Sequence, residues 1–166
     1  MGLFGFLEKD NKKDEAESRA SAIEPKTSKL DYDLGETAEN FSKNFGNRFD
    51  LDFSCNSLSK VNELLDEVND FVEDEDRKND IMTMAGAYVF EVAKRNFGGK
   101  YYWIESEQQP ILIAGEPDYS VSIKAWDKVK KYMENGSEDD LKYYIDGYKE
   151  YIEKGKKNKG YSAQII

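Results

Sequence analysis

The residues whose spacing most directly suggests chemistry are carboxylates in the stretch 63–76. Intervals of three and four residues put the first four on one face of a helix, and the next four continue the negative surface along the chain. We interpret them as a docking surface for a basic protein partner or a mimic of nucleic-acid phosphates. The alternative is a solvated helix face that keeps the protein soluble. The eight carboxylates are Glu63, Asp66, Glu67, Asp70, Glu73, Asp74, Glu75 and Asp76.

The sequence offers no metal-binding or cofactor-binding motif. An EF-hand loop requires Gly at its sixth position, but a loop counted from Asp50 has Cys55 there, and one counted from Glu73 also lacks the glycine. The chain has no His and one Cys. That excludes a Ser-His-Asp triad, a Cys-His dyad, a His-ligated metal, a Cys-based zinc site and an intrachain disulfide. We therefore predict neither a metal nor a cofactor.

The best candidate for acid–base chemistry is Glu91, which stands inside the most apolar helical stretch of the chain. A carboxyl group buried among apolar side chains can serve as a general acid. Arg95 follows one helical turn later and can pair with it. We interpret the two as an ion pair that fixes helix packing, and we predict no catalytic residue and no enzymatic activity.

Aromatic residues suggest a second kind of site. Tyr101, Trp103 and Trp126 could line a groove for a small ligand such as a sugar or a peptide. In a strand, alternation sends Tyr101 and Trp103 to the same face. The alternative is a sheet face that simply packs on helices.

Composition limits the classes of protein. The chain has 166 residues and a formal net charge of −10, with 34 acids against 24 bases. That charge argues against general nucleic-acid binding, which needs cations to displace the counterions of phosphates. An aromatic content of 13% is too high for a disordered chain. The length fits one folded domain, and the absence of an export signal together with a lone thiol indicates a cytoplasmic protein.

Composition also divides the chain into three parts. Residues 1–30 lack a core-facing pattern beyond a short apolar start, so we expect a flexible N-terminal segment. Residues 31–154 should form a single globular domain, and residues 155–166 a solvated basic tail. The apolar side chains in residues 1–7 leave open a weak membrane contact, which would make this a membrane-peripheral protein.

Hydrophobic periodicity predicts the elements of that domain. Apolar side chains at helical spacing indicate four to five helices, over 36–45, 58–72, 77–96, about 126–134 and 141–152. Strands are expected at 100–106 and 110–114 across a polar turn, with a third at 119–121 and a short edge piece at 51–53. The fold class is therefore α+β, with four to five helices packed on a small antiparallel sheet of two to three strands.

A loose pattern over about residues 80–140 resembles that of small bacterial proteins of unknown function, some of which resemble immunity proteins of toxin systems. It consists of a helix containing Gly86-Ala87-Tyr88-Val89-Phe90-Glu91, the segment Gly98-Gly99-Lys100-Tyr101-Tyr102-Trp103, and a helix ending at Asn135-Gly136-Ser137. The resemblance implies an α+β fold and supplies no catalytic residue.

The residues and the resemblance together give one leading hypothesis and two alternatives. The leading hypothesis is a non-enzymatic, acidic binding protein of a bacterial type, of the immunity or antitoxin kind, whose 63–76 surface meets a basic protein. The first alternative is a small-ligand-binding or enzymatic domain that uses the aromatic sheet face and Glu91. The second is a membrane-peripheral protein that uses residues 1–7.

Overall fold

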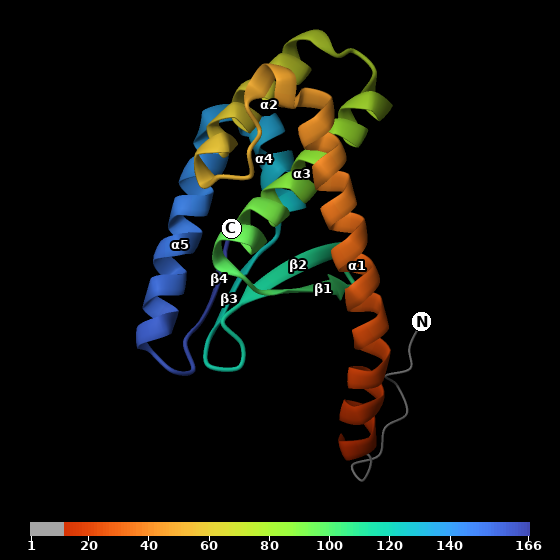
Figure 1. The fold of residues 1–166 in the computed structure, drawn as a ribbon, viewed down its shortest axis with the longest axis vertical. Helices are drawn as coiled ribbons and strands as arrows, with labels where there is room; N and C mark the ends of the chain where they lie inside the picture. Colours follow the sequence, from red (N-terminus) through yellow and green to blue (C-terminus); the bar gives the residue numbers. More distant parts are fainter. Residues whose placement is uncertain (1–11) are drawn as a thin grey trace.

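The computed structural model describes the backbone of residues 12–166 and the side chains from residue 29 onward. Over these residues the fold is α+β, as predicted, with five α-helices, two short 3₁₀ turns and one sheet (Figure 1). The elements are α1 (Lys12–Phe49), η1 (Cys55–Ser57), α2 (Leu58–Phe71), α3 (Glu75–Phe97), β1 (Lys100–Ile104), β2 (Gln109–Ala114), β3 (Ser120–Ile123), α4 (Ala125–Asn135), η2 (Gly136–Asp139), α5 (Leu141–Lys157) and β4 (Ser162–Ile165).

The central helix α3 organises the core. Its residues 85–93 are all buried, as the apolar sequence of this helix predicted. It packs against α1 on one side and α4 on the other, and α1 also contacts β1. Figure 1 shows α1 and α5 on opposite sides of the molecule, with α3 and the sheet between them. The helix ends at Gly98, whose φ of 78° is a backbone conformation that favours glycine.

The sheet has four strands rather than the two to three expected, and it is mixed rather than antiparallel. The strand order is β1-β2-β3-β4, with antiparallel pairing up to β3 and a parallel pairing of β3 with β4. The register pairs Tyr101 with Leu112 and Leu112 with Ile123, and all three side chains are buried on one face.

The fourth strand comes from the segment expected to be a solvated basic tail: residues 156–160 are exposed, but residues 162–165 belong to the sheet. Helix α5 continues to Lys157, the chain turns through Gly160, and residues 162–165 pair with β3. The Ser120 amide also donates to the Tyr161 carbonyl over 2.8 Å. The lysines that dominate the composition of this segment precede the strand and do not interrupt it.

The first helix is much longer than the predicted helix at 36–45. The backbone of residues 12–49 is one helix, which includes most of the segment expected to be flexible. Within it Leu34, Ala38 and Phe41 are buried at helical spacing. The hypothesis of a membrane contact through residues 1–7 lies outside the described residues.

The short strand expected at 51–53 is not formed. Asp50 and Phe53 have φ values of 52° and 61°, which interrupt an extended backbone. The loop is held instead by the buried hydroxyl of Tyr88, which accepts the Phe53 amide over 2.9 Å and lies 2.7 Å from the Ser57 Oγ.

Candidate functional site

The carboxylates of α2 lie on the side of the helix away from the core. Val61, Leu65 and Val68 are buried, whereas Glu63, Asp66 and Asp70 are exposed and Glu67 is half-buried. The predicted helix phase is therefore correct: one face of α2 packs on the core and the other carries the acids.

Three of these α2 carboxylates have partners within the molecule. Glu63 pairs with Lys60 at 3.0 Å, and Glu67 pairs with Arg48 of α1 at 2.7 Å. Asp66 accepts a hydrogen bond of 2.9 Å from the hydroxyl of Tyr132 in α4. Burial, followed by this hydrogen bond, raises the pKa of Tyr132. Asp66 and Glu67 therefore contribute to the contacts between helices as well as to the negative surface, whereas the partner of Glu63 lies within α2.

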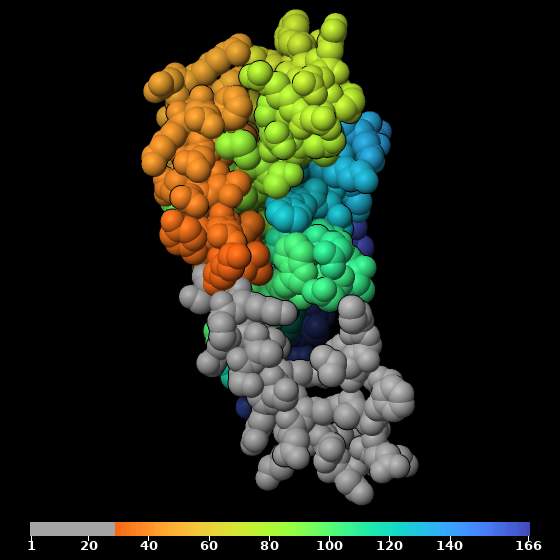
Figure 2. All heavy atoms as spheres, turned by 90° about the vertical axis from the view of Figure 1, so that its right-hand side faces the viewer, coloured from red at the N-terminus to blue at the C-terminus, as the bar shows by residue number. Residues whose placement is uncertain are grey.

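The remaining acids gather where α2 passes into α3, at one end of the molecule, at the top of Figures 1 and 2. All are exposed, and we call them the acidic tip: Asp70, Glu73, Asp74, Glu75 and Asp76. The Asp74 carboxylate caps α3 by accepting the Asp76 and Arg77 amides at 3.0 and 3.2 Å. Glu75 lies 3.5 Å from Lys78.

An exposed aromatic side chain stands inside the acidic tip. Phe71, the last residue of α2, is 79% exposed, while its neighbour Val72 is half-buried against the core. Among the described residues, Asp70, Glu73 and Asp76 have neither a hydrogen-bond nor an ion-pair partner on their side chains. The tip thus presents one large apolar group among carboxylates with unused hydrogen-bonding capacity.

Glu91 sits in a closed polar network between α3, β1 and α1. Its side chain is buried, and it accepts the Tyr101 hydroxyl at 2.8 Å and the Arg95 Nε at 3.0 Å. Arg95 also binds Glu39 of α1 at 2.8 Å and stacks over the Phe53 ring at 3.7 Å. Burial, then the neighbouring Glu91 carboxylate, raises the pKa of Tyr101. The predicted Glu91–Arg95 pair is present, and each oxygen of Glu91 has a partner.

The three aromatic residues expected to line a groove do not come together. Tyr101 is fully buried and packs edge-on against Phe90 at 5.6 Å. Trp103 is 40% exposed and Trp126 half-buried, and their rings meet in a T-shaped contact at 6.3 Å. Only the two tryptophans therefore lie near a shared surface.

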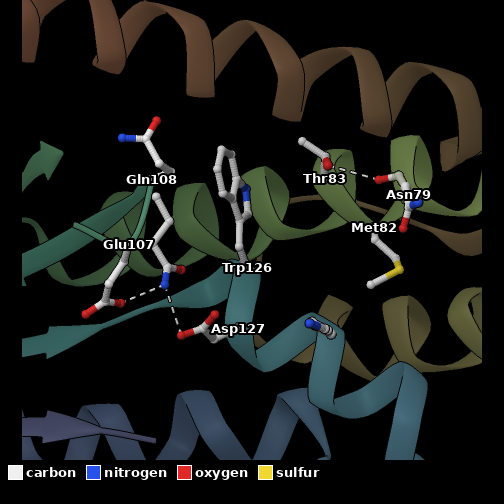
Figure 3. A pocket seen from close by; sticks show the side chains of 9 residues that line it. Asn79, Met82, Thr83, Glu107, Gln108, Trp126 and Asp127 are labelled. Atoms are coloured by element: carbon white, nitrogen blue, oxygen red, sulfur yellow. Dashed lines mark hydrogen bonds between the residues drawn. The ribbon is translucent and has the colours of Figure 1, made fainter. Parts of the chain in front are cut away.

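Sequence reasoning missed a hollow beside Trp126. It has a volume of about 250 Å³ and opens between the first turns of α3, the β1–β2 hairpin and α4, three elements that lie side by side in Figure 2 (close-up in Figure 3). The sequence of its polar hairpin residues indicates only a turn, because a turn and a ligand-facing loop have the same composition. The residues that line it are Asn79, Met82, Thr83, Glu107, Gln108, Gln109, Trp126, Asp127 and Lys130.

Two further observations limit the chemistry of these surfaces. Within the side chains that the structure describes, no group of three or more Asp, Glu or Cys residues is arranged to hold a metal ion. Cys55 is half-buried, and burial raises the pKa of its thiol, which disfavours the reactive thiolate.

Comparison of the chain with protein-family models, with curated proteins and with solved structures finds no match in any of the three. Across residues 12–166, no helix combines the length and the apolar character that crossing a membrane requires.

Proposed function

We propose that this protein is a non-enzymatic binding protein whose acidic tip docks a basic segment of a partner protein. The observation that carries the proposal is Phe71, 79% exposed among five carboxylates. An exposed aromatic side chain rimmed by charge is a common arrangement of a binding hot spot, because burial of the ring supplies affinity and the rim supplies selectivity.

The charges of the tip favour a cationic partner. Asp70, Glu73 and Asp76 have no partner among the described residues, so lysine or arginine side chains could pair with them without displacing an existing contact. Burial of the Phe71 ring against an apolar side chain of the same segment would contribute about 1.5–3 kcal/mol. The occupant that matches the tip is therefore a basic stretch that also carries an apolar side chain.

The hydrogen bonds of Glu91 support the proposal of a non-enzymatic protein. Both of its oxygens are held by donors, and the cluster packs α1 and β1 onto α3. A protein that acts by covering a basic surface needs only a stable shape and complementary charge. Immunity proteins and antitoxins act in this way, and we place this protein in that class as part of the proposal.

The test compares two charge-matched double variants in affinity purification from the native cell followed by mass spectrometry. Asp70→Lys with Glu73→Lys reverses the charge at two of the five tip positions, and Glu134→Lys with Glu150→Lys makes the same charge change at exposed positions of α4 and α5. A specific partner should be a basic protein that is recovered with the wild type and the control but lost with the tip variant.

The purified partner then gives the decisive measurement. Its association rate should fall as salt rises, because exposed charges are screened within about 8 Å at physiological ionic strength. Phe71→Ser should speed dissociation. Equal binding of the wild type and the tip variant at low and high salt would show that the tip is a solvated surface and that the proposed function is wrong.

A further inference from the structure

The hollow beside Trp126 is a second surface with its own chemistry. In Figure 3 its hairpin side carries Glu107 and Gln108 with Asp127 close by, and its other side carries Asn79, Met82 and Thr83 of α3. Gln109 of the hairpin also lines the hollow. The Trp126 indole stands between the two sides. The acidic tip does not contribute to the lining, so an inference drawn here is independent of the proposed docking function.

One end of the hollow is rich in hydrogen-bond acceptors. Gln109 is only 8% exposed, and its Nε2 donates both to Glu107 Oε2 at 2.8 Å and to Asp127 Oδ2 at 3.1 Å. These two bonds fix the orientation of the amide, so that Oε1 faces away from the carboxylates. That buried oxygen has no hydrogen-bond partner among the described residues. A buried acceptor without a donor is destabilising, so this oxygen points to a ligand that donates a hydrogen bond.

The charges at this end are well defined. Glu107 receives a hydrogen bond of 2.6 Å from Lys124, which is the main reason that the pKa of Glu107 is lowered. Its charge is thus balanced by Lys124, while Asp127, which is exposed, receives only the Gln109 amide among the described residues. Asp127 therefore remains available to bind a cationic group.

The hollow also offers hydrogen-bond donors. The Trp126 Nε1–H is buried without an acceptor among the described residues, and Figure 3 shows this nitrogen on the side of the indole that faces α3. Lys130 adds an exposed ammonium group that has no ion-pair partner among residues 29–166. An indole N–H and an ammonium group that line the same hollow favour an anionic or carbonyl oxygen.

We propose that this hollow binds a small zwitterion of the α-amino-acid class. The ligand ammonium group pairs with Asp127 and donates to Gln109 Oε1, and its carboxylate pairs with Lys130 and accepts from Trp126 Nε1. A volume of about 250 Å³ limits the ligand to a small molecule. Because both unpartnered atoms are shielded from bulk water, a ligand that reaches them must displace side chains around the hollow.

The test uses the indole N–H signals of the full chain in a proton–nitrogen correlation spectrum. The chain has two Trp residues, so two signals are expected, and Trp103→Phe assigns the one that belongs to Trp126. The probes are the twenty protein amino acids, titrated one at a time. At least one should shift the Trp126 signal in a saturable way, and its decarboxylated amine and its deaminated acid should each bind about tenfold more weakly or worse, because each lacks one charged contact.

Two variants then test separately the proposed contact with the ligand ammonium group and the proposed contact with its carboxylate. Asp127→Asn and Lys130→Met should each weaken binding of the amino acid by about tenfold, while Glu134→Gln, an exposed acid later in α4 that does not line the hollow, should leave binding unchanged. The same spectra report whether each variant is folded. The proposal is overturned if no amino acid shifts the Trp126 signal, which is also the result if only water occupies the hollow. It is equally overturned if the amine alone binds as tightly as the amino acid, or if both variants bind like the wild type.

Discussion

Gly86 of α3 provides the space in which Trp126 of α4 packs. A Cβ atom at Gly86 would lie 2.2 Å from Trp126 Cδ1, closer than atoms can approach, and in a tight contact of 3.0 Å with its Nε1. The contact joins the central helix to the helix that lines the hollow, and it sets the position of the indole. A glycine in the middle of a buried helix is thereby explained by packing rather than by backbone conformation.

Gly86→Ala should therefore destabilise the protein. Overpacking of this kind costs about 1–3 kcal/mol, and the short distance to a ring places the cost at the upper end. The gain from removing a glycine from a helix is only about 0.5–1 kcal/mol. The matched control is Gly147→Ala in α5, where an added Cβ meets nothing within 4 Å and which should gain that amount. Urea unfolding of both variants measures the difference, and equal effects would contradict the packing argument.

Glu91→Gln should lower stability although it preserves the shape of the side chain. The change removes the charge that faces Arg95, while an oxygen remains for the Tyr101 hydroxyl. Because Arg95 is partly exposed and keeps Glu39, we expect a cost of about 1–3 kcal/mol rather than that of a fully buried pair. Glu39→Gln, on the exposed side of the same arginine, should cost less than about 1 kcal/mol. A Glu91→Gln protein as stable as the wild type would show that the network is not needed for packing.

The Lys128–Asp139 pair should make stability depend on pH in the acidic range. Asp139 accepts the buried Lys128 at 2.7 Å and Asn135 at 2.8 Å, and the hydrogen bond from Lys128 is the main reason that the pKa of Asp139 is lowered. Because the pKa of Asp139 is lower in the folded state, the ionised carboxylate stabilises the folded protein at pH values above the ordinary Asp pKa of about 3.9. This stabilisation is lost as the pH falls through the folded-state pKa.

Asp139→Asn tests this linkage. At neutral pH the variant should be less stable than the wild type by about 2 kcal/mol, because the buried ammonium loses its charged partner. The difference should shrink as the pH falls from the ordinary Asp pKa of about 3.9 through the folded-state pKa, below which the wild-type carboxyl is also neutral. Unfolding free energies from pH 7 to pH 2.5 give the comparison, and a difference that is constant with pH would contradict it.

Asp66 and Asp70 should differ in their effect on stability although both are exposed acids on one helix face. Asp66→Ala removes the acceptor of the Tyr132 hydroxyl and should cost about 1–2 kcal/mol. Asp70→Ala removes a side chain without a partner among the described residues and should change stability by no more than about 0.5 kcal/mol. Thermal unfolding of the two variants at the same salt concentration decides the point.

The parts of the fold that depend on local sequence could be predicted. The buried faces of α2 and α3 follow from apolar spacing within one helix, and the β1–β2 hairpin follows from two short apolar runs across a polar turn. The Glu91–Arg95 pair could be predicted for the same reason, since its two residues are one helical turn apart.

The parts of the fold and of the site that depend on contacts between distant residues could not be predicted from the sequence. Strand β4 has only Ala163 and Ile165 as inward-facing residues, and its partner β3 lies two helices earlier in the chain. The hollow forms where α3, the β1–β2 hairpin and α4 come together, and Gln109 and Trp126 belong to two of these elements. Nothing in the local sequence of either residue indicates that the Gln109 oxygen or the Trp126 indole N–H would be buried without a hydrogen-bond partner. Trp126 itself could be singled out by residue type, but its neighbours could not.

The parallel pairing of β3 and β4 has a consequence for the order of folding. β1, β2 and β3 are joined by short connections, whereas the chain must complete α4 and α5 before β4 can reach β3. Contacts between distant parts of a chain carry a larger loop-closure entropy and form more slowly. During refolding, the β4 amides should therefore gain protection from hydrogen exchange after those of β1 and β2. Of the four strands of this sheet, β4 would then be the last to join, so the sheet would not be complete until α4 and α5 had brought residues 162–165 to β3.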